Sequence, residues 1–129
     1  MIVDSSALIA ILLNEPGAER LADALADAPA PRISAANLLE AMLVITARLG
    51  PAGTQALRDL MEVCALSVEP VDHALAEAAF TGWLRFGKGR HPAGLNFGDC
   101  FAYALAQQPE LALLFKGDDF RRTDVIAAV

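Results

Sequence analysis

The sequence lacks the features that mark several large classes of protein. No apolar run approaches the roughly 20 residues that a membrane-spanning helix needs. The short apolar start has no basic n-region and is interrupted by Asp4, so we expect neither a membrane anchor nor a signal peptide. The two cysteines, Cys64 and Cys100, stand apart in apolar surroundings without metal-ligand spacing. This usage is typical of core thiols in a reduced, cytoplasmic protein.

Several sequence motifs of common enzymes are also missing. No G-x-G-x-x-G or G-x-x-x-x-G-K-[ST] pattern occurs, which disfavours dinucleotide and P-loop sites. His73 and His91 are far apart, and Ser5 and Ser6 lack the glycine-flanked turn of a serine nucleophile. The formal net charge of −6 argues against a general nucleic-acid binder with a basic face.

Short apolar segments alternate with segments of helical periodicity along the whole chain. With 129 residues, of which 55% are hydrophobic, we expect one domain over 1–129 with a substantial core. The expected strands lie at 1–3, 32–35, 66–68, 111–115 and, at an edge, 125–129. Strands that alternate with helices predict an α/β fold with a central, mostly parallel sheet of four to five strands.

The helical segments carry recognisable start and stop signals. Ser34 or Asn37 can cap a helix that Gly50-Pro51 closes, and a further helix should follow over 52–61. Asp72 should cap another, in which a stripe of apolar residues has the spacing of a buried helix face. The stripe consists of Ala76, Phe80, Trp83 and Leu84.

Acidic residues follow the predicted strands at several places. Asp4 follows the first strand, Glu40 lies early in the helix after the second, and Asp99 lies in the first turn of a late helix. Asp118 and Asp119 follow the last central strand. Because the carboxyl ends of parallel strands share one edge of the sheet, we expect these side chains to converge.

Converging carboxylates would repel one another and raise their own pKa values unless a cation compensates. Mg²⁺ suits such a site, because it takes hard oxygen ligands and keeps several waters. A cation held in this way can activate water and stabilise the leaving oxygen of a phosphodiester, so the pattern indicates nucleic-acid hydrolysis. The basic loop at 87–94 offers Lys88 and Arg90 for contacts with an RNA backbone, although charged loops are more often simply solvated.

Each acid also has an ordinary structural explanation. Asp4 can cap the first helix, Asp99 can form a capping box with Asn96, and 118–119 can be a turn. Glu40 is different, because the positions that follow it on the same helix face are apolar and a buried charge needs a partner. The coincidence of all of them at strand ends favours a common site.

Four stretches of the chain, at 1–7, 35–40, 95–104 and 113–125, resemble the PIN-domain nucleases, and among them the VapC-type toxins of bacterial toxin–antitoxin pairs. The resemblance runs from end to end, with the acids in the same order and spacing. It implies a three-layer α/β/α fold and a Mg²⁺- or Mn²⁺-dependent endoribonuclease that acts on RNA. It also implies inhibition by a cognate antitoxin and, usually, a homodimer.

The resemblance assigns roles to individual residues. Asp4 and Asp99 match the core metal ligands, Glu40 the third acid and Asp119 the last one. Asp118 stands where many relatives have asparagine. Three further residues are candidates for a supporting role at the site: Ser6, Thr123 and Asp124.

Two alternatives of other classes stay open. A receiver-type phosphoacceptor also gathers acids at strand ends, but it would need an acid pair on the first strand and an acid after the third. Here Asp4 stands alone, and the third strand ends in Glu69-Pro70. A non-catalytic protein-binding module with the same fold is the other alternative. The apolar helices between Leu38 and Met61 additionally suggest a dimer interface.

Overall fold

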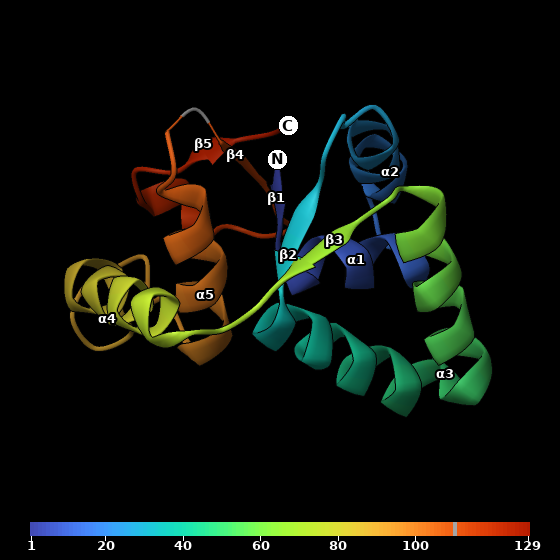
Figure 1. The fold of residues 1–129 in the computed structure, drawn as a ribbon, viewed down its shortest axis with the longest axis horizontal. Helices are drawn as coiled ribbons and strands as arrows, with labels where there is room; N and C mark the ends of the chain where they lie inside the picture. Colours follow the sequence, from blue (N-terminus) through green and yellow to red (C-terminus); the bar gives the residue numbers. More distant parts are fainter. Residues whose placement is uncertain (110) are drawn as a thin grey trace.

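A five-stranded parallel sheet forms the centre of the computed structural model, which describes residues 1–109 and 111–129 (Figure 1). The strands are β1 (Ile2–Val3), β2 (Arg32–Ser34), β3 (Ser67–Glu69), β4 (Ala112–Leu114) and β5 (Ile126–Ala127). Their order across the sheet is β3-β2-β1-β4-β5, and every neighbouring pair is parallel. The predicted α/β class and parallel sheet are confirmed.

Helices cover both faces of this sheet. They are α1 (Ser5–Leu12), α2 (Ala18–Ala26), α3 (Ala35–Val63), α4 (His73–Phe86) and α5 (Phe97–Ala106). In Figure 1, α4 and α5 lie on one side of the sheet, whereas α1, α2 and the second half of α3 lie on the other. Neighbouring strand residues point into opposite cores: Ile2 packs with α5, and Val3 packs with α1. The three-layer arrangement is therefore confirmed.

Helix α3 contains the break that the sequence predicts. Gly50 has a positive φ of 69° between the two halves of α3, a conformation that favours glycine. Pro51 follows it as the first residue of the second half, where a proline costs no hydrogen bond. At the other end, the side chain of Ser34 caps the helix by accepting from the Asn37 N–H at 3.0 Å.

The apolar stripe of α4 is the one clear error in the expected core. Phe80 is 53% exposed and Leu84 is 42% exposed, and Trp83 is half-buried. The reason is that α4 packs on α5 through a different face, on which Ala79 and Gly82 are buried. An added Cβ on Gly82 would lie 2.5 Å from Tyr103 Cδ1, so only glycine permits this approach.

The strand order also decides where a site can form. From β1 the chain proceeds in one direction to β2 and β3, and later in the other direction to β4 and β5. The crevice at such a reversal, beyond the carboxyl ends of β1 and β4, is the usual binding site of open α/β sheets. Receiver domains have the order 2-1-3-4-5, so the sheet argues against the phosphoacceptor alternative.

Among the described residues, no helix has the length and apolarity required to cross a membrane.

Candidate active site

A small pocket of about 190 Å³ lies beyond the carboxyl ends of β1 and β4. Its lining brings together four acids that are far apart in the sequence, namely Asp4, Glu40, Asp99 and Asp119. These are the four residues that the sequence nominates for catalysis. Their convergence is the central geometric feature of the molecule.

Asp4 is delivered by β1 and is 2% exposed. Its carboxylate caps α1 by accepting the Ser6 N–H at 2.9 Å and also accepts the Ser6 hydroxyl. Burial raises the pKa of Asp4, the Ser6 hydrogen bonds oppose that rise, and the charge of Glu40 adds to it. The two Ser6 hydrogen bonds hold the Asp4 carboxylate in one orientation.

Glu40 finds its partner on α1. The Ser5 hydroxyl donates to Glu40 Oε2 at 2.9 Å. This hydrogen bond supplies the partner that a carboxylate on an otherwise apolar face of α3 requires. The carboxylate also lies directly against the backbone of Gly98, at the start of α5. Glu40 is thus held between the first turns of two helices.

Asp99 has two roles at once. It forms a capping box at the start of α5, in which the Asn96 N–H donates to Asp99 Oδ2 and the Asp99 N–H donates to Asn96 Oδ1, both at 2.9 Å. Burial raises the pKa of Asp99 to about 7, against the Asn96 hydrogen bond and with the help of the charges of Asp4, Asp119 and Glu40. The Asp99 side chain therefore belongs both to the capping box of α5 and to the acidic pocket.

Asp119 and Asp118 point to different places. Asp119 begins the short 3-10 helix η1 (Asp119–Arg122) and lines the acidic pocket. Asp118 does not line that pocket, and its exposed carboxylate pairs with Arg121 at 3.5 Å. The geometry favours Asp119 as the fourth acid of the cluster.

One buried polar residue that the sequence reading did not assign to the site, Asn37, connects the elements of the site. Asn37 is fully buried, and its amide donates to the Gly98 carbonyl at 2.9 Å and, more weakly, to Asp4 Oδ1 at 3.4 Å. Its own oxygen accepts the Ser34 hydroxyl at 2.6 Å. Asn37 therefore ties α3 to the first turn of α5. The available signal was an amide within an apolar segment, because a buried amide requires partners.

Two C-terminal candidates lie outside the pocket. The Thr123 hydroxyl donates to the Phe120 carbonyl at 2.7 Å and closes the turn after η1. Asp124 accepts from Arg85 at 2.9 Å and from the Tyr103 hydroxyl at 2.8 Å. These contacts anchor the last segment of the chain to α4 and α5, so any effect of either residue on the acids is indirect.

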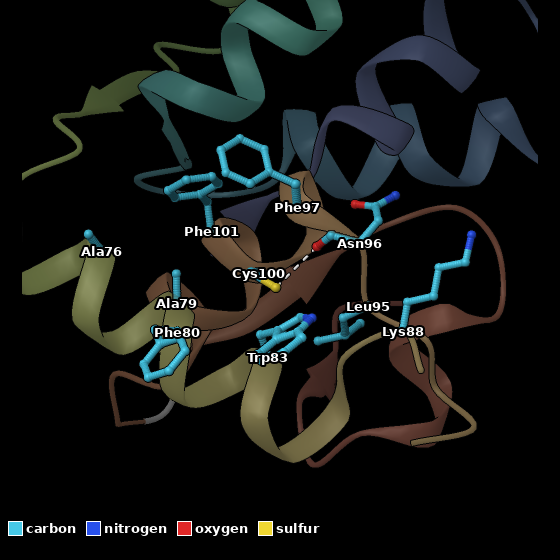
Figure 2. A pocket seen from close by; sticks show the side chains of 10 residues that line it. All are labelled: Ala76, Ala79, Phe80, Trp83, Lys88, Leu95, Asn96, Phe97, Cys100 and Phe101. Carbon is cyan, nitrogen blue, oxygen red and sulfur yellow. Dashed lines mark hydrogen bonds between the residues drawn. The ribbon is translucent and has the colours of Figure 1, made fainter. Parts of the chain in front are cut away.

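The basic loop lies beside an apolar groove of about 560 Å³ rather than in the acidic pocket (Figure 2). Lys88 lines the groove, and the Arg90 guanidinium lies 5.0 Å from the centre of the Trp83 ring and donates to the Leu84 carbonyl. Asn96 lines both the groove and the acidic pocket. Figure 2 shows Lys88 and Asn96 at the same end of the groove, which places Lys88 nearer the acids than the groove's far end at Ala76.

The donor set suits a hard divalent cation. Within the described residues, no three His, Cys, Asp or Glu side chains are already arranged to hold a metal ion together. Mg²⁺ does not require this, because it usually binds one or two carboxylates and completes its shell with water and phosphate oxygens. The raised pKa values of Asp4 and Asp99 show that ionised carboxylates are unfavourable here without a compensating charge. Mg²⁺ or Mn²⁺ would supply it.

The fold and the acidic pocket agree with the family comparison. The family model described as PIN domain matches residues 1–126, so the chain belongs to the PIN-domain family.

Within that family, the chain is similar to proteins named Ribonuclease VapC. It is 48% identical over 127 residues to Ribonuclease VapC of Mycolicibacterium smegmatis, with 98% of each chain covered. It is 48% identical over 130 residues to Ribonuclease VapC28 of Mycobacterium tuberculosis, with 100% of this chain and 98% of the relative covered. The resemblance seen in the sequence is confirmed.

A solved structure shares the fold. The crystal structure of Mycobacterium tuberculosis VapC20, a toxin that cleaves the sarcin-ricin loop, superposes with a TM-score of 0.77 at 20% identity. The match covers 97% of this chain and 95% of that one. At this identity, the likeness supports the three-layer architecture.

Without divalent cations, the protein should lose stability as the pH rises from about 5 to about 8. The pKa of Asp99 is about 7 in the folded protein against an ordinary value of 3.8. The folded state therefore binds more protons than the unfolded state in this range, and the free energy of unfolding falls with pH. Allowing for partial exposure of Asp99, we expect a decrease on the order of 2 kcal/mol. Denaturant unfolding in EDTA measures it, and Asp99→Asn should flatten the dependence. Equal slopes for both proteins would contradict this account.

Replacing Gly98 with alanine should slow RNA cleavage by about tenfold or more while changing stability little. An added Cβ would lie 3.1 Å from Glu40 Cδ and 3.3 Å from Glu40 Oε1, so the carboxylate must leave the Ser5 hydroxyl. The move is inexpensive in stability, because the displaced group ends a flexible side chain. Single-turnover rates and thermal unfolding measure the two effects.

A double-mutant cycle makes this explanation specific. If Gly98 acts through Glu40, adding Gly98→Ala to Glu40→Ala should cause no further loss of rate. Additive losses would show that Gly98 matters for another reason.

Proposed function

We propose that residues 1–129 form a single nuclease domain, a metal-dependent endoribonuclease that is the toxin of a toxin–antitoxin pair. The observation that carries the proposal is the convergence of Asp4, Glu40, Asp99 and Asp119 in one pocket at the reversal of strand order. The names of the VapC ribonucleases, similar over nearly the full length, support RNA as the substrate.

In this proposal Asp4 and Asp99 hold Mg²⁺, or alternatively Mn²⁺. Both come from rigid positions, at the end of β1 and in the first turn of α5, and both are oriented by backbone N–H groups. When bound, the ion offsets the charge of the carboxylates and of the RNA phosphate and makes water a stronger nucleophile.

Glu40 and Asp119 complete the site by accepting hydrogen bonds from the attacking water. The Ser5 hydroxyl keeps Glu40 directed along the wall of the pocket. Asp119 stands at the exposed rim, where an accepted proton can pass to solvent. The phosphate backbone needs positive partners against four acids. Lys116 lines the acidic pocket, Lys88 lines the neighbouring groove, and Arg90 stacks on Trp83 in that groove.

Replacing Asp4 with asparagine should reduce RNA cleavage by at least about a thousandfold while the fold is retained. Asparagine caps helices as well as aspartate does, so α1 keeps its start. Purified protein and a mixed RNA pool with Mg²⁺ or Mn²⁺ provide the assay, and circular dichroism checks the fold.

The matched control is Asp118→Asn, which removes an exposed acid outside the pocket. It should retain nearly full activity. A fully active Asp4→Asn protein would remove the central assignment. Wild-type protein that cleaves no RNA with either metal would instead favour the non-catalytic binding module.

The proposal includes a cognate antitoxin as the inhibiting partner. Such a protein must neutralise the acidic pocket, so we expect it to place a basic side chain among the carboxylates. The proposal also includes a cytoplasmic location, where RNA substrates occur together with the reducing conditions that suit the free thiols of Cys64 and Cys100.

We also propose a homodimer formed through an exposed apolar surface of α3 and α5. Leu39 is 56%, Leu43 63% and Phe97 82% exposed, and all three line one groove between these helices. Large exposed apolar patches of this kind mark interfaces. The patch lies on the first half of α3, within the segment that the sequence suggests for dimerisation.

Leu43→Glu should raise the dimer dissociation constant by at least about tenfold, because it places a charge in the apolar centre of the surface. Val63→Glu is the matched control, since Val63 is 84% exposed at the far end of α3. Sedimentation velocity at micromolar concentrations distinguishes the two. A wild-type protein that sediments only as a monomer would refute the dimer.

A further inference from the structure

A second pocket, of about 340 Å³, lies next to the acidic one and has the opposite charge. Its basic residues come from three separate elements: Arg20 from α2, Lys116 from the segment after β4, and Arg121 from η1. Lys116 lines both pockets. The positive pocket therefore begins where the cluster of acids ends.

The gathering of these cations is unusual for this chain. Three of its ten lysine and arginine residues line one pocket, although the formal net charge is −6. Most basic side chains have structural partners: Arg32 pairs with Glu69, Arg85 pairs with Asp124, and Arg90 stacks on an aromatic ring. Within the pocket, the Lys116 ammonium donates to the Pro16 carbonyl. Arg20, by contrast, has no ion pair among the described residues.

Asp118 is the only acidic side chain in the lining of this pocket. It pairs with Arg121 at 3.5 Å, with side chains that are 87% and 64% exposed. An exposed pair of this kind contributes little free energy. Arg121 can therefore exchange Asp118 for a stronger anionic partner without a large loss of stability.

We propose that Arg20, Lys116 and Arg121 form a phosphate-binding subsite for the RNA strand, next to the phosphodiester that is cleaved. The inference rests on the proposed ribonuclease function. The strand passes from the carboxylates over the Lys116 ammonium, and an adjacent phosphate enters the pocket between the two guanidinium groups. Phosphate contacts position a strand without reading its sequence, and arginine suits them because its planar group donates two parallel hydrogen bonds.

This assignment solves an electrostatic difficulty of the site. Four carboxylates repel a polyanion, and a bound cation offsets only part of their charge. The basic loop stands on the side of the acidic pocket where Asn96 lies, next to the apolar groove. The Arg20–Lys116–Arg121 pocket supplies attraction on the side where Lys116 lies, so the strand is held beyond both ends of the acidic cluster.

The test compares two double variants in the non-cleaving Asp4→Asn protein. Arg20→Gln with Arg121→Gln should weaken binding of a fluorescent single-stranded RNA by about tenfold and lower the salt-dependence slope by about 0.7, the value for one lost phosphate contact. The matched control is Arg48→Gln with Arg58→Gln, two exposed arginines of α3. In the otherwise wild-type enzyme, the first pair should raise KM and leave kcat unchanged. Thermal unfolding verifies that both double variants remain folded.

The outcomes separate this inference from the proposed function. If the wild type cleaves RNA but the Arg20/Arg121 variant binds RNA as tightly as the control, the subsite is wrong and the nuclease stands. If the wild type cleaves no RNA, the proposed function fails first. If a polyglutamate peptide of equal length binds the pocket as tightly as RNA, with the same loss in the double variant, the pocket is an acidic-peptide site and the phosphate assignment is overturned.

Discussion

The gathering of four carboxylates in one partly buried pocket is the constraint on which the rest of the site depends. The parallel sheet and its change of direction at β1 and β4 force Asp4, Glu40, Asp99 and Asp119 into one pocket. Burial and mutual charge then raise the pKa of Asp99 to about 7. A protein that keeps such a cluster tolerates a cost in its own stability, and a hard dication, as proposed above, would remove much of that cost.

Structural and chemical roles coincide in these residues. Asp4 caps α1, and Asp99 completes the capping box of α5. Both are also members of the acidic cluster. The ordinary explanations of Asp4 and Asp99 are therefore correct and do not compete with the functional ones. A cap needs an oxygen fixed against backbone N–H groups, and the same fixation orients a metal ligand. Serine and asparagine side chains then complete the orientation, with Ser5 holding Glu40 and Asn37 joining α3 to α5.

The surface around the site divides by chemistry. Beyond Asn96 lies an apolar groove edged by Lys88, and beyond Lys116 lies the basic pocket of Arg20 and Arg121. A second apolar groove spans α3 and α5 and shares Asn96, Phe97 and Phe101 with the first. In the proposed function, the basic pocket would serve the polyanion and the exposed apolar surface would serve a second protein chain. The sequence does not reveal the basic pocket, because Arg20 lies about a hundred residues before Lys116 and Arg121 and each cation alone resembles a solvated charge.

The sequence by itself determined the α/β class, the positions of the strands, the break at Gly50 and the four acids, because each is encoded by local periodicity, capping or turn chemistry. It misjudged the α4 stripe, since helical spacing shows that a face is apolar but not whether another element covers it. Only the tertiary structure shows that Asp119 lines the acidic pocket whereas Asp118 does not, and that Asp124 bonds to Arg85 and Tyr103. It also reveals that Ser5 contacts Glu40 and that Asn37 joins α3 to α5. Those outcomes depend on the distance and direction between side chains of different elements, and no local pattern in the chain specifies them.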